Sequence, residues 1–265
     1  MSPLTSRTAV LFAGGETQFR RQFTENLRQL VGDIRFLWMP NRFDGATSYS
    51  SETPTSGRAI TWTKGAITKQ GHGYLQTFDG STHFGLSPDT ANLTFGNGIT
   101  DQAFSVVVLT NITDTAGERV FVSKWNSGTS QREWLFEISG VDKLKLQLYD
   151  ETAGKTVQRL SDAVVSQSAL HVYAGTYDGT GGATAMNGAT VYVDGVAQTS
   201  TATNDALYVA MGNKTAGCQI AGVNAAATVP AQGTMGLVMV SAGVLSAANL
   251  LKINTYVNQF YGTGF

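Results

Sequence analysis

The chain has 265 residues and a formal net charge of −1, and only 14% of its residues are charged. Such a weak charge excludes an electrostatic surface able to hold a nucleic-acid backbone, so nucleic acid is not an expected partner. The single cysteine, Cys218, excludes an intrachain disulfide and a metal cage built from thiolates.

The first 33 residues are predicted to form an arm that carries one amphipathic helix. An apolar run at residues 9–13 is too short for a signal-peptide core, and no stretch is apolar over a membrane-spanning length, so we expect neither a cleaved signal nor membrane insertion. Over residues 16–31 one helix face carries a stripe made of Phe19, Phe23, Leu27 and Leu30. This attachment helix needs a partner, which is either a neighbouring molecule or the chain's own remaining structure.

From residue 34 onward the pattern changes to short runs of period two, separated by Gly, Asn, Asp, Ser and Thr. The clearest run is "KLKLQLY", which places Leu144, Leu146 and Leu148 on one face and polar residues on the other. Near the end, Ser246 stands at an N-cap position before a helical pattern that ends at about residue 260. The sequence therefore predicts an all-β, two-sheet antiparallel sandwich over residues 34–265, closed by a short C-terminal helix.

The segments "ALHVYAGTYDG" and "ATVYVDGV" follow one another, and "GTMGLVMVSAGVLSAANLLKI" comes near the end of the chain. In this order they resemble the laminin-G-like branch of the concanavalin A-like lectin and glucanase family, and the resemblance covers residues 34–265. It implies a jelly roll of the concanavalin A-like kind. One position departs from the pattern, because the residue before His171 is usually Trp in the family and is Leu170 here.

The sequence predicts no enzyme. Glucanase relatives carry two catalytic carboxylates on one strand, and the nearest pair here is Glu133 and Glu137. Four residues along a strand separate such a pair by roughly 13 Å, too far for either hydrolase geometry, so we expect them on a solvated strand face. The order of residues leaves a Ser-His-Asp triad open, but no motif points to one.

Binding of a sugar needs aromatic rings and amides on a sheet face or in loops. The candidates have this chemistry, although burial in the core is the alternative for the tryptophans, and they are Trp62, Trp125, Asn126, Trp134 and Tyr149. In calcium-binding relatives acidic loop residues hold the ion, and the nearest candidates here are Asp79, Asp178 and Asp194. No dense acidic loop accompanies them, so we expect no metal and no other cofactor.

The resemblance extends to laminin-G-like domains of tailed-phage virions, which serve as head decoration proteins, fibres or adhesins. It implies a non-enzymatic structural protein of the virion surface, assembled in the host cytoplasm. Its expected partners are capsid or tail proteins, further copies of itself and a cell-surface glycan. The alternatives are a free-standing carbohydrate-binding lectin and a divergent glycosidase.

Overall fold

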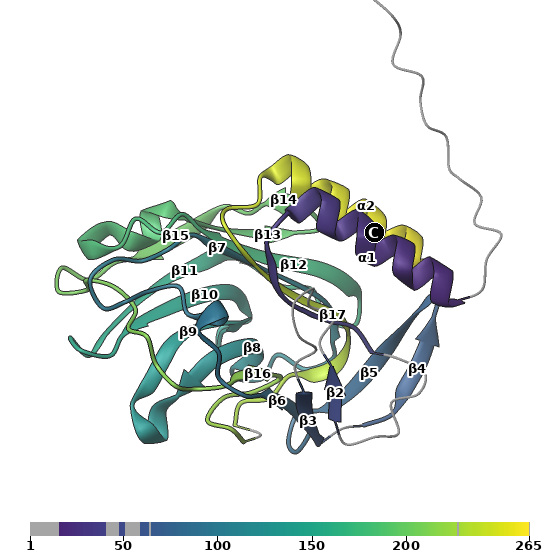
Figure 1. Cartoon of the computed structure of the whole chain (residues 1–265), viewed down its shortest axis with the longest axis horizontal. Helices are drawn as coiled ribbons and strands as arrows, with labels where there is room; N and C mark the ends of the chain where they lie inside the picture. The colour runs from purple at the N-terminus through teal and green to yellow at the C-terminus, as the bar shows by residue number, and fades with distance from the viewer. Residues whose placement is uncertain (1–15, 41–47, 51–58, 64, 227, 265) are drawn as a thin grey trace, which may run out of the picture.

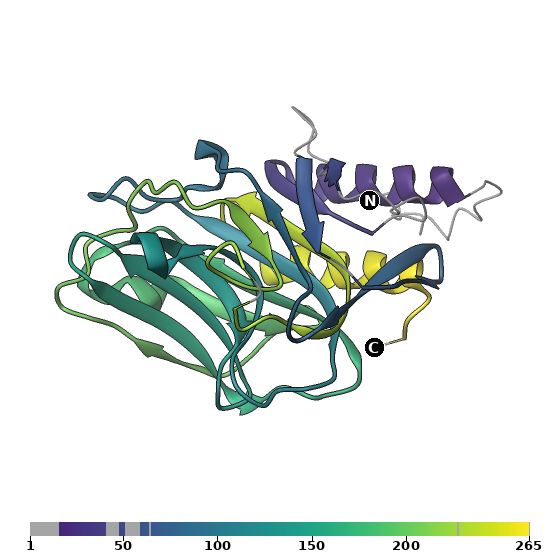
Figure 2. The same cartoon turned by 90° about the horizontal axis from the view of Figure 1, so that it is seen from below.

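The computed structural model describes residues 16–40, 48–50, 59–63, 65–226 and 228–264. Within them, two antiparallel sheets lie face to face, and two helices lie along one side of the sandwich (Figures 1 and 2). The predicted all-β, concanavalin A-like sandwich with a helix near each end is therefore confirmed. None of the described helices is both long and apolar enough to cross a bilayer.

An eight-stranded sheet forms the layer beneath the helices. Its strand order is β14 (Val196–Ala197), β13 (Ala189–Val193), β12 (Leu170–Tyr177), β7 (Phe104–Ile112), β17 (Gln232–Ala242), β5 (Gly73–Asp79) and β4 (Ile67–Gln70). The eighth strand, β1 (Ile34–Trp38), pairs with the last part of β17, whose first part pairs with β5.

A nine-stranded sheet forms the second layer. Its order is β15 (Ser200–Thr203), β11 (Lys155–Val164), β10 (Lys143–Asp150), β9 (Gln131–Ile138), β8 (Arg119–Asn126), β16 (Cys218–Ile220), β6 (Phe84–Ser87), β3 (Ala59–Thr63) and β2 (Ser48–Ser50). Among the described residues, three short 3-10 helices lie in the connections, namely η1 (Ala91–Leu93), η2 (Ser127–Thr129) and η3 (Gly182–Gly188). The face of this sheet that points away from the eight-stranded sheet is called the outer face below.

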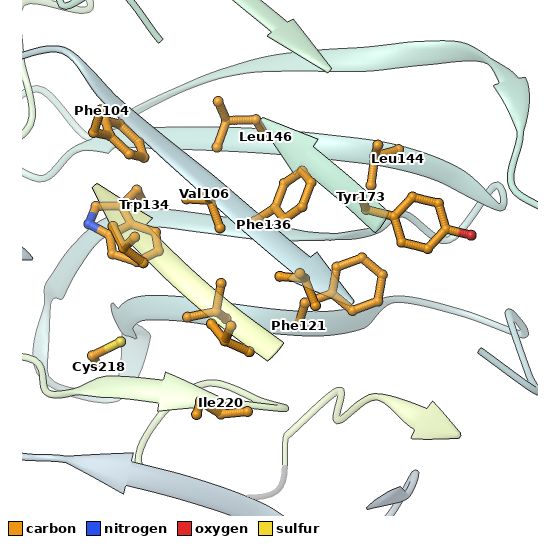
Figure 3. Packing of buried hydrophobic residues seen from close by; sticks show 14 of the residues in the cluster. Phe104, Val106, Phe121, Trp134, Phe136, Leu144, Leu146, Tyr173, Cys218 and Ile220 are labelled. Carbon is orange, nitrogen blue, oxygen red and sulfur yellow. The ribbon is translucent and has the colours of Figure 1, made fainter. Parts of the chain in front are cut away.

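The main hydrophobic core fills the space between the sheets, as Figure 3 shows. Leu144, Leu146 and Leu148 point into it, which confirms the alternation predicted for β10. From the facing sheet, Tyr173 stacks on Phe121 with their ring centroids 5.7 Å apart. Side chains that interdigitate in this way fix the packing of the two sheets. Because inward and outward residues alternate along each strand, the packing also fixes which side chains point outward.

The two helices, α1 (Glu16–Val31) and α2 (Ala247–Tyr261), contact each other and the eight-stranded sheet. Phe23 and Leu27 of α1 are buried, and Phe23 stacks on Phe260 of α2 at 4.5 Å between ring centroids. Phe19 and Leu30 are partly buried against the same cluster. The stripe predicted for attachment to a neighbour is thus covered by the chain itself, because α2 and the sheet present a matching apolar surface. Residues 1–15 of the predicted arm lie outside the described residues.

Ser246 is the N-cap of α2, at the position where the sequence predicts it. Ser246 Oγ accepts a hydrogen bond from the backbone N–H of Asn249 at 3.2 Å, as predicted. We expect Ser246→Ala to lower the free energy of unfolding by about 1 kcal/mol, because it leaves that N–H without its acceptor. Urea denaturation measures the loss. Ser246→Asp restores an acceptor and is the control, and equal loss in both variants would contradict a capping role.

Candidate functional site

The five residues predicted to bind sugar divide into two groups. Trp62 and Trp134 are 5% and 0% exposed, and both belong to the core between the sheets. The indole N–H of Trp134 donates to the carbonyl of Leu93 at 2.9 Å, which satisfies its polar atom inside the core. The prediction that these two residues bind glycan is therefore wrong, since no ligand can reach them.

The other three, Trp125, Asn126 and Tyr149, keep part of their surface exposed. Trp125 packs on the outer-face cluster of Val120, Leu135 and Val223. Phe121, four residues earlier on β8, would share its face in a regular strand but lies in the core. The register of β8 shifts between Val120 and Val122 and again between Lys124 and Trp125, and these irregularities turn Trp125 outward.

Trp125 and Tyr149 form an aromatic corner on the outer face. Their rings meet edge to face with centroids 5.4 Å apart. The guanidinium carbon of Arg132 lies 3.7 Å from the centre of the Tyr149 ring, and the guanidinium binds both carboxylate oxygens of Glu151 at 2.8 and 3.1 Å. Stacking and a bidentate ion pair hold the aromatic corner in one arrangement before any ligand arrives.

Two hollows flank the aromatic corner. Trp125 borders a small one of about 100 Å³, which the side chains of Glu137, Lys145 and Gln147 also line. Asn126 borders a larger one of about 300 Å³. The polar side chains around the larger hollow are amides, hydroxyls and one carboxylate, namely Asn126, Gln131, Thr61, Ser87, Thr129, Thr215 and Asp89. Such groups donate and accept hydrogen bonds as sugar hydroxyls require.

Beneath this surface a lysine neutralises a glutamate. Lys124 Nζ lies 2.7 Å from Glu133 and 2.8 Å from Asp89, and both Lys124 and Glu133 are fully buried. Glu133 also accepts hydrogen bonds from the backbone N–H of Lys214 at 2.7 Å and from Thr94. Burial raises the pKa of Glu133 to about 7, although the ammonium of Lys124 opposes the shift.

Glu137, four residues further along β9, repeats this arrangement. It is buried against Lys145 of β10, which also reaches Glu118 at 3.3 Å. Burial raises the pKa of Glu137 to about 7, with Lys145 opposing the shift. The expectation that Glu133 and Glu137 occupy a solvated face is wrong, because lysines on the neighbouring strands allow both carboxylates to be buried.

The three weak calcium candidates serve as turn and hairpin anchors. Asp79 accepts backbone N–H groups of Ser81, Thr82 and His83. Asp178 accepts the N–H and hydroxyl of Thr180, and Asp194 binds His171 and the N–H of Val172. In the part of the chain that the structure describes, no three His, Cys, Asp or Glu side chains come together as ligands for a metal.

Comparisons with known proteins agree with the fold. A family model described as concanavalin A-like lectin/glucanases superfamily, Laminin_G_3, matches residues 79–250. No curated protein sequence matches the chain.

Solved structures with the same fold share little sequence. The botulinum neurotoxin serotype G binding domain aligns with a TM-score of 0.61 at 10% identity, over 87% of this chain and 54% of that one. The serotype D ligand binding domain, in complex with N-acetylneuraminic acid, gives 0.60 at 10% identity over 90% and 56%. Domain 4 of AbnA, a GH43 extracellular arabinanase from Geobacillus stearothermophilus in complex with arabinotriose, gives 0.55 at 16% identity over 84% and 98%. The chain therefore spans about half the length of the neurotoxin domains and nearly all of the arabinanase domain.

Proposed function

Because this chain belongs to the concanavalin A-like lectin/glucanases superfamily, we propose that it is a carbohydrate-binding protein whose glycan lies on the outer face of the nine-stranded sheet. The observation that carries this proposal is the partly exposed aromatic corner of Trp125 and Tyr149 beside the hollow that Asn126 borders. Two of the structures with the same fold contain a sugar, N-acetylneuraminic acid and arabinotriose.

The chemistry of the outer face matches a sugar in two ways. The partly exposed rings of Trp125 and Tyr149 offer apolar surface against which the C–H face of a sugar ring can pack. Asn126, Gln131 and nearby hydroxyls offer fixed polar atoms for the sugar's hydroxyl groups. Since Arg132 already holds Tyr149 in place, little ordering cost remains to be met on binding.

We infer that this face does not cleave glycosidic bonds. A glycoside hydrolase needs two carboxyl groups that face each other across the scissile bond. Glu133 and Glu137 lie four residues apart on one strand, and each is bound to a buried lysine. Glu133 is fully buried, and Glu137, which lines the smaller hollow, is paired with Lys145.

Removal of one aromatic side chain tests the proposal. We expect Trp125→Ala to weaken glycan binding by about 30-fold or more, the equivalent of about 2 kcal/mol for the loss of an aromatic anchor. A glycan array identifies the ligand, and titration calorimetry with that ligand measures the change. Asn126→Ala is expected to weaken binding to a smaller degree.

The matched control is Tyr256→Ala, which removes a half-buried aromatic ring from α2 on the opposite side of the sandwich. It is expected to leave glycan affinity unchanged. Equal loss in Trp125→Ala and Tyr256→Ala would mean that general destabilisation causes the effect. An array on which the folded wild-type protein binds no glycan would overturn the proposal.

Display on a virion surface, with capsid or tail proteins as partners, is a narrower proposal that rests on the sequence resemblance. Its attachment helix is covered by α2 and the eight-stranded sheet, so α1 no longer supports it. Light scattering of the full chain tests the self-association that this narrower proposal requires, and a monomer would contradict it.

A further inference from the structure

Three side chains outside the glycan site form a continuous chain of hydrogen bonds. Ser166 Oγ lies 2.6 Å from His171 Nε2, and His171 Nδ1 lies 2.7 Å from Asp194 Oδ2. A serine hydroxyl is thus joined to one imidazole nitrogen and a carboxylate to the other. This is the connectivity by which a histidine activates a serine nucleophile, and it recurs on unrelated folds in any order along the chain.

The backbone of a hairpin holds the carboxylate in place. Asp194 occupies the turn between β13 and β14 with φ of 51°, a conformation that Asp and Asn tolerate better than most residues. Its N–H donates to the carbonyl of Val172 at 2.8 Å, and its Oδ1 accepts the N–H of Val172 at 2.9 Å. Because Oδ1 is engaged, Oδ2 is left for His171 Nδ1, which fixes the imidazole tautomer with its Nε2 lone pair toward Ser166.

The serine is held from both sides and is open to solvent. The N–H groups of Val165 and Ser168 donate to the carbonyls of Asp142 and Ile112 at 2.8 and 2.7 Å. Ser166 lies between these two anchors and is exposed, while the His171 side chain is 17% exposed. The hydroxyl is therefore both positioned and accessible, as a nucleophile requires.

A further donor lies beside the imidazole. The rings of His171 and Tyr173 have centroids 5.8 Å apart. Figure 3 shows the buried hydroxyl of Tyr173 at the edge of the core cluster, pointing away from the other labelled side chains. Burial and the carboxylate of Asp194 raise the pKa of Tyr173, although a hydrogen bond with Ser166 opposes the shift, so the hydroxyl keeps its proton beside the serine.

We propose that Ser166, His171 and Asp194 form a nucleophilic site that hydrolyses small carboxylic esters, independently of glycan binding. A small, exposed acyl group is the fitting substrate, because Ser166 is on the surface and neither hollow of the outer face includes these residues.

The reaction balances with water as the only co-substrate. Ser166 Oγ bonds to the ester carbonyl carbon as its proton passes to His171 Nε2, and the electron pair of the carbonyl double bond moves onto the carbonyl oxygen. The carbon–oxygen bond to the alcohol breaks, and His171 gives its proton to the departing alkoxide. A water molecule then attacks the acyl-serine, its proton goes through His171 back to Ser166, and the carboxylic acid leaves.

The alternative is that the same contacts only stabilise the turn between β13 and β14. The test therefore measures covalent labelling and ester hydrolysis, which a purely structural role would not produce. The full chain is incubated with a fluorophosphonate probe, and intact-mass and peptide mass spectrometry locate the adduct. We expect one adduct, on Ser166. Hydrolysis of p-nitrophenyl acetate is measured in parallel.

Ser166→Ala is expected to abolish labelling without changing the melting temperature, because the residue is exposed. His171→Gln is expected to lower the hydrolysis rate by about 10²- to 10⁴-fold, the usual contribution of a general base. Asp194→Asn is expected to slow hydrolysis as well. Asparagine tolerates the left-handed backbone conformation of this turn as aspartate does, so the turn is kept.

Ser168→Gly, which removes a hydroxyl from the same exposed loop, is the matched control. It is expected to be labelled by the probe and to hydrolyse the ester as wild type does. The proposal is overturned if wild-type protein is not labelled, if the adduct maps to another residue, or if Ser166→Ala hydrolyses the ester as fast as wild type. None of these outcomes affects the glycan proposal, which the array tests separately.

Discussion

Replacing Lys124 with methionine is expected to lower the free energy of unfolding by about 3 to 5 kcal/mol at neutral pH. Methionine fills a similar volume but leaves Glu133 with no ammonium at 2.7 Å, in a place where no solvent reaches the carboxylate. Removing one member of a buried ion pair leaves an uncompensated charge, which costs far more than the pair contributes. Chemical denaturation followed by tryptophan fluorescence measures the loss.

The loss is expected to depend on pH in a defined direction. The pKa of Glu133 is raised from 4.5 to about 7 in the folded protein, so the unfolded chain releases this proton at lower pH than the folded one. The contribution of Glu133 to the free energy of unfolding therefore falls as the pH rises from 4.5 to about 7. Without Lys124 the pKa rises further, so Lys124→Met is expected to cost more at pH 8 than at pH 5.

Two further variants test whether the loss comes from the unpaired buried charge of Glu133. Adding Glu133→Gln to Lys124→Met removes the stranded charge and is expected to recover a large part of the loss and to remove most of its pH dependence. Glu25→Gln breaks the exposed pair with Arg21, 2.9 Å apart, and is expected to cost less than about 1 kcal/mol. If Lys124→Met lowered the free energy of unfolding no more than Glu25→Gln does, the burial of the Lys124–Glu133 pair would not be what makes its loss costly.

Phe23→Ala is expected to lower the free energy of unfolding by about 3 to 5 kcal/mol, the cost typical of a buried phenylalanine. The ring stacks on Phe260 at 4.5 Å and meets the edge of Tyr261 at 6.5 Å, so its removal opens a cavity between the two helices. The melting transition is expected to stay cooperative and to shift as a whole. That result would make α1 part of the folded unit, although the predicted domain boundary lies after residue 33.

Arg21→Ala is the control on the same helix, since the Arg21 side chain is 81% exposed, and it is expected to leave stability within about 0.5 kcal/mol of wild type. A Phe23→Ala protein that keeps its stability but loses an oligomeric state would contradict this account. It would restore the stripe as a surface for attachment to a neighbour.

Local patterns predicted most of the fold. The helix expected over residues 16–31 is α1, and the one expected over 246–260 is α2 with Ser246 as its N-cap. The period-two run in β10 also points its leucines into the core. These signals succeed because helix periodicity, capping and strand alternation depend on neighbours within a few residues.

The candidate site was predicted less well, because side-chain environment depends on strands far apart in the chain. Alternation cannot show that Trp125 turns outward, since the register shifts of β8 appear only when β9 is paired with it. Likewise, nothing in "REWLFEIS" shows that Lys124 and Lys145 approach Glu133 and Glu137 from the strands on either side. His171 meets Asp194 only when β12 and β13 pair, and no short motif encodes the chain from Ser166 through His171 to Asp194.

The position of β17 has a consequence for how the protein folds. This strand lies inside the eight-stranded sheet, between β7 on one side and β5 and β1 on the other, and Ile34 pairs with Ser241 near the other end of the chain. Pairing between such distant segments is slow, because a long loop must close before any contact forms. On the ribosome, β1, β5 and β7 all emerge before the strand that joins them. Until β17 arrives, their open edges are free to pair with another nascent chain.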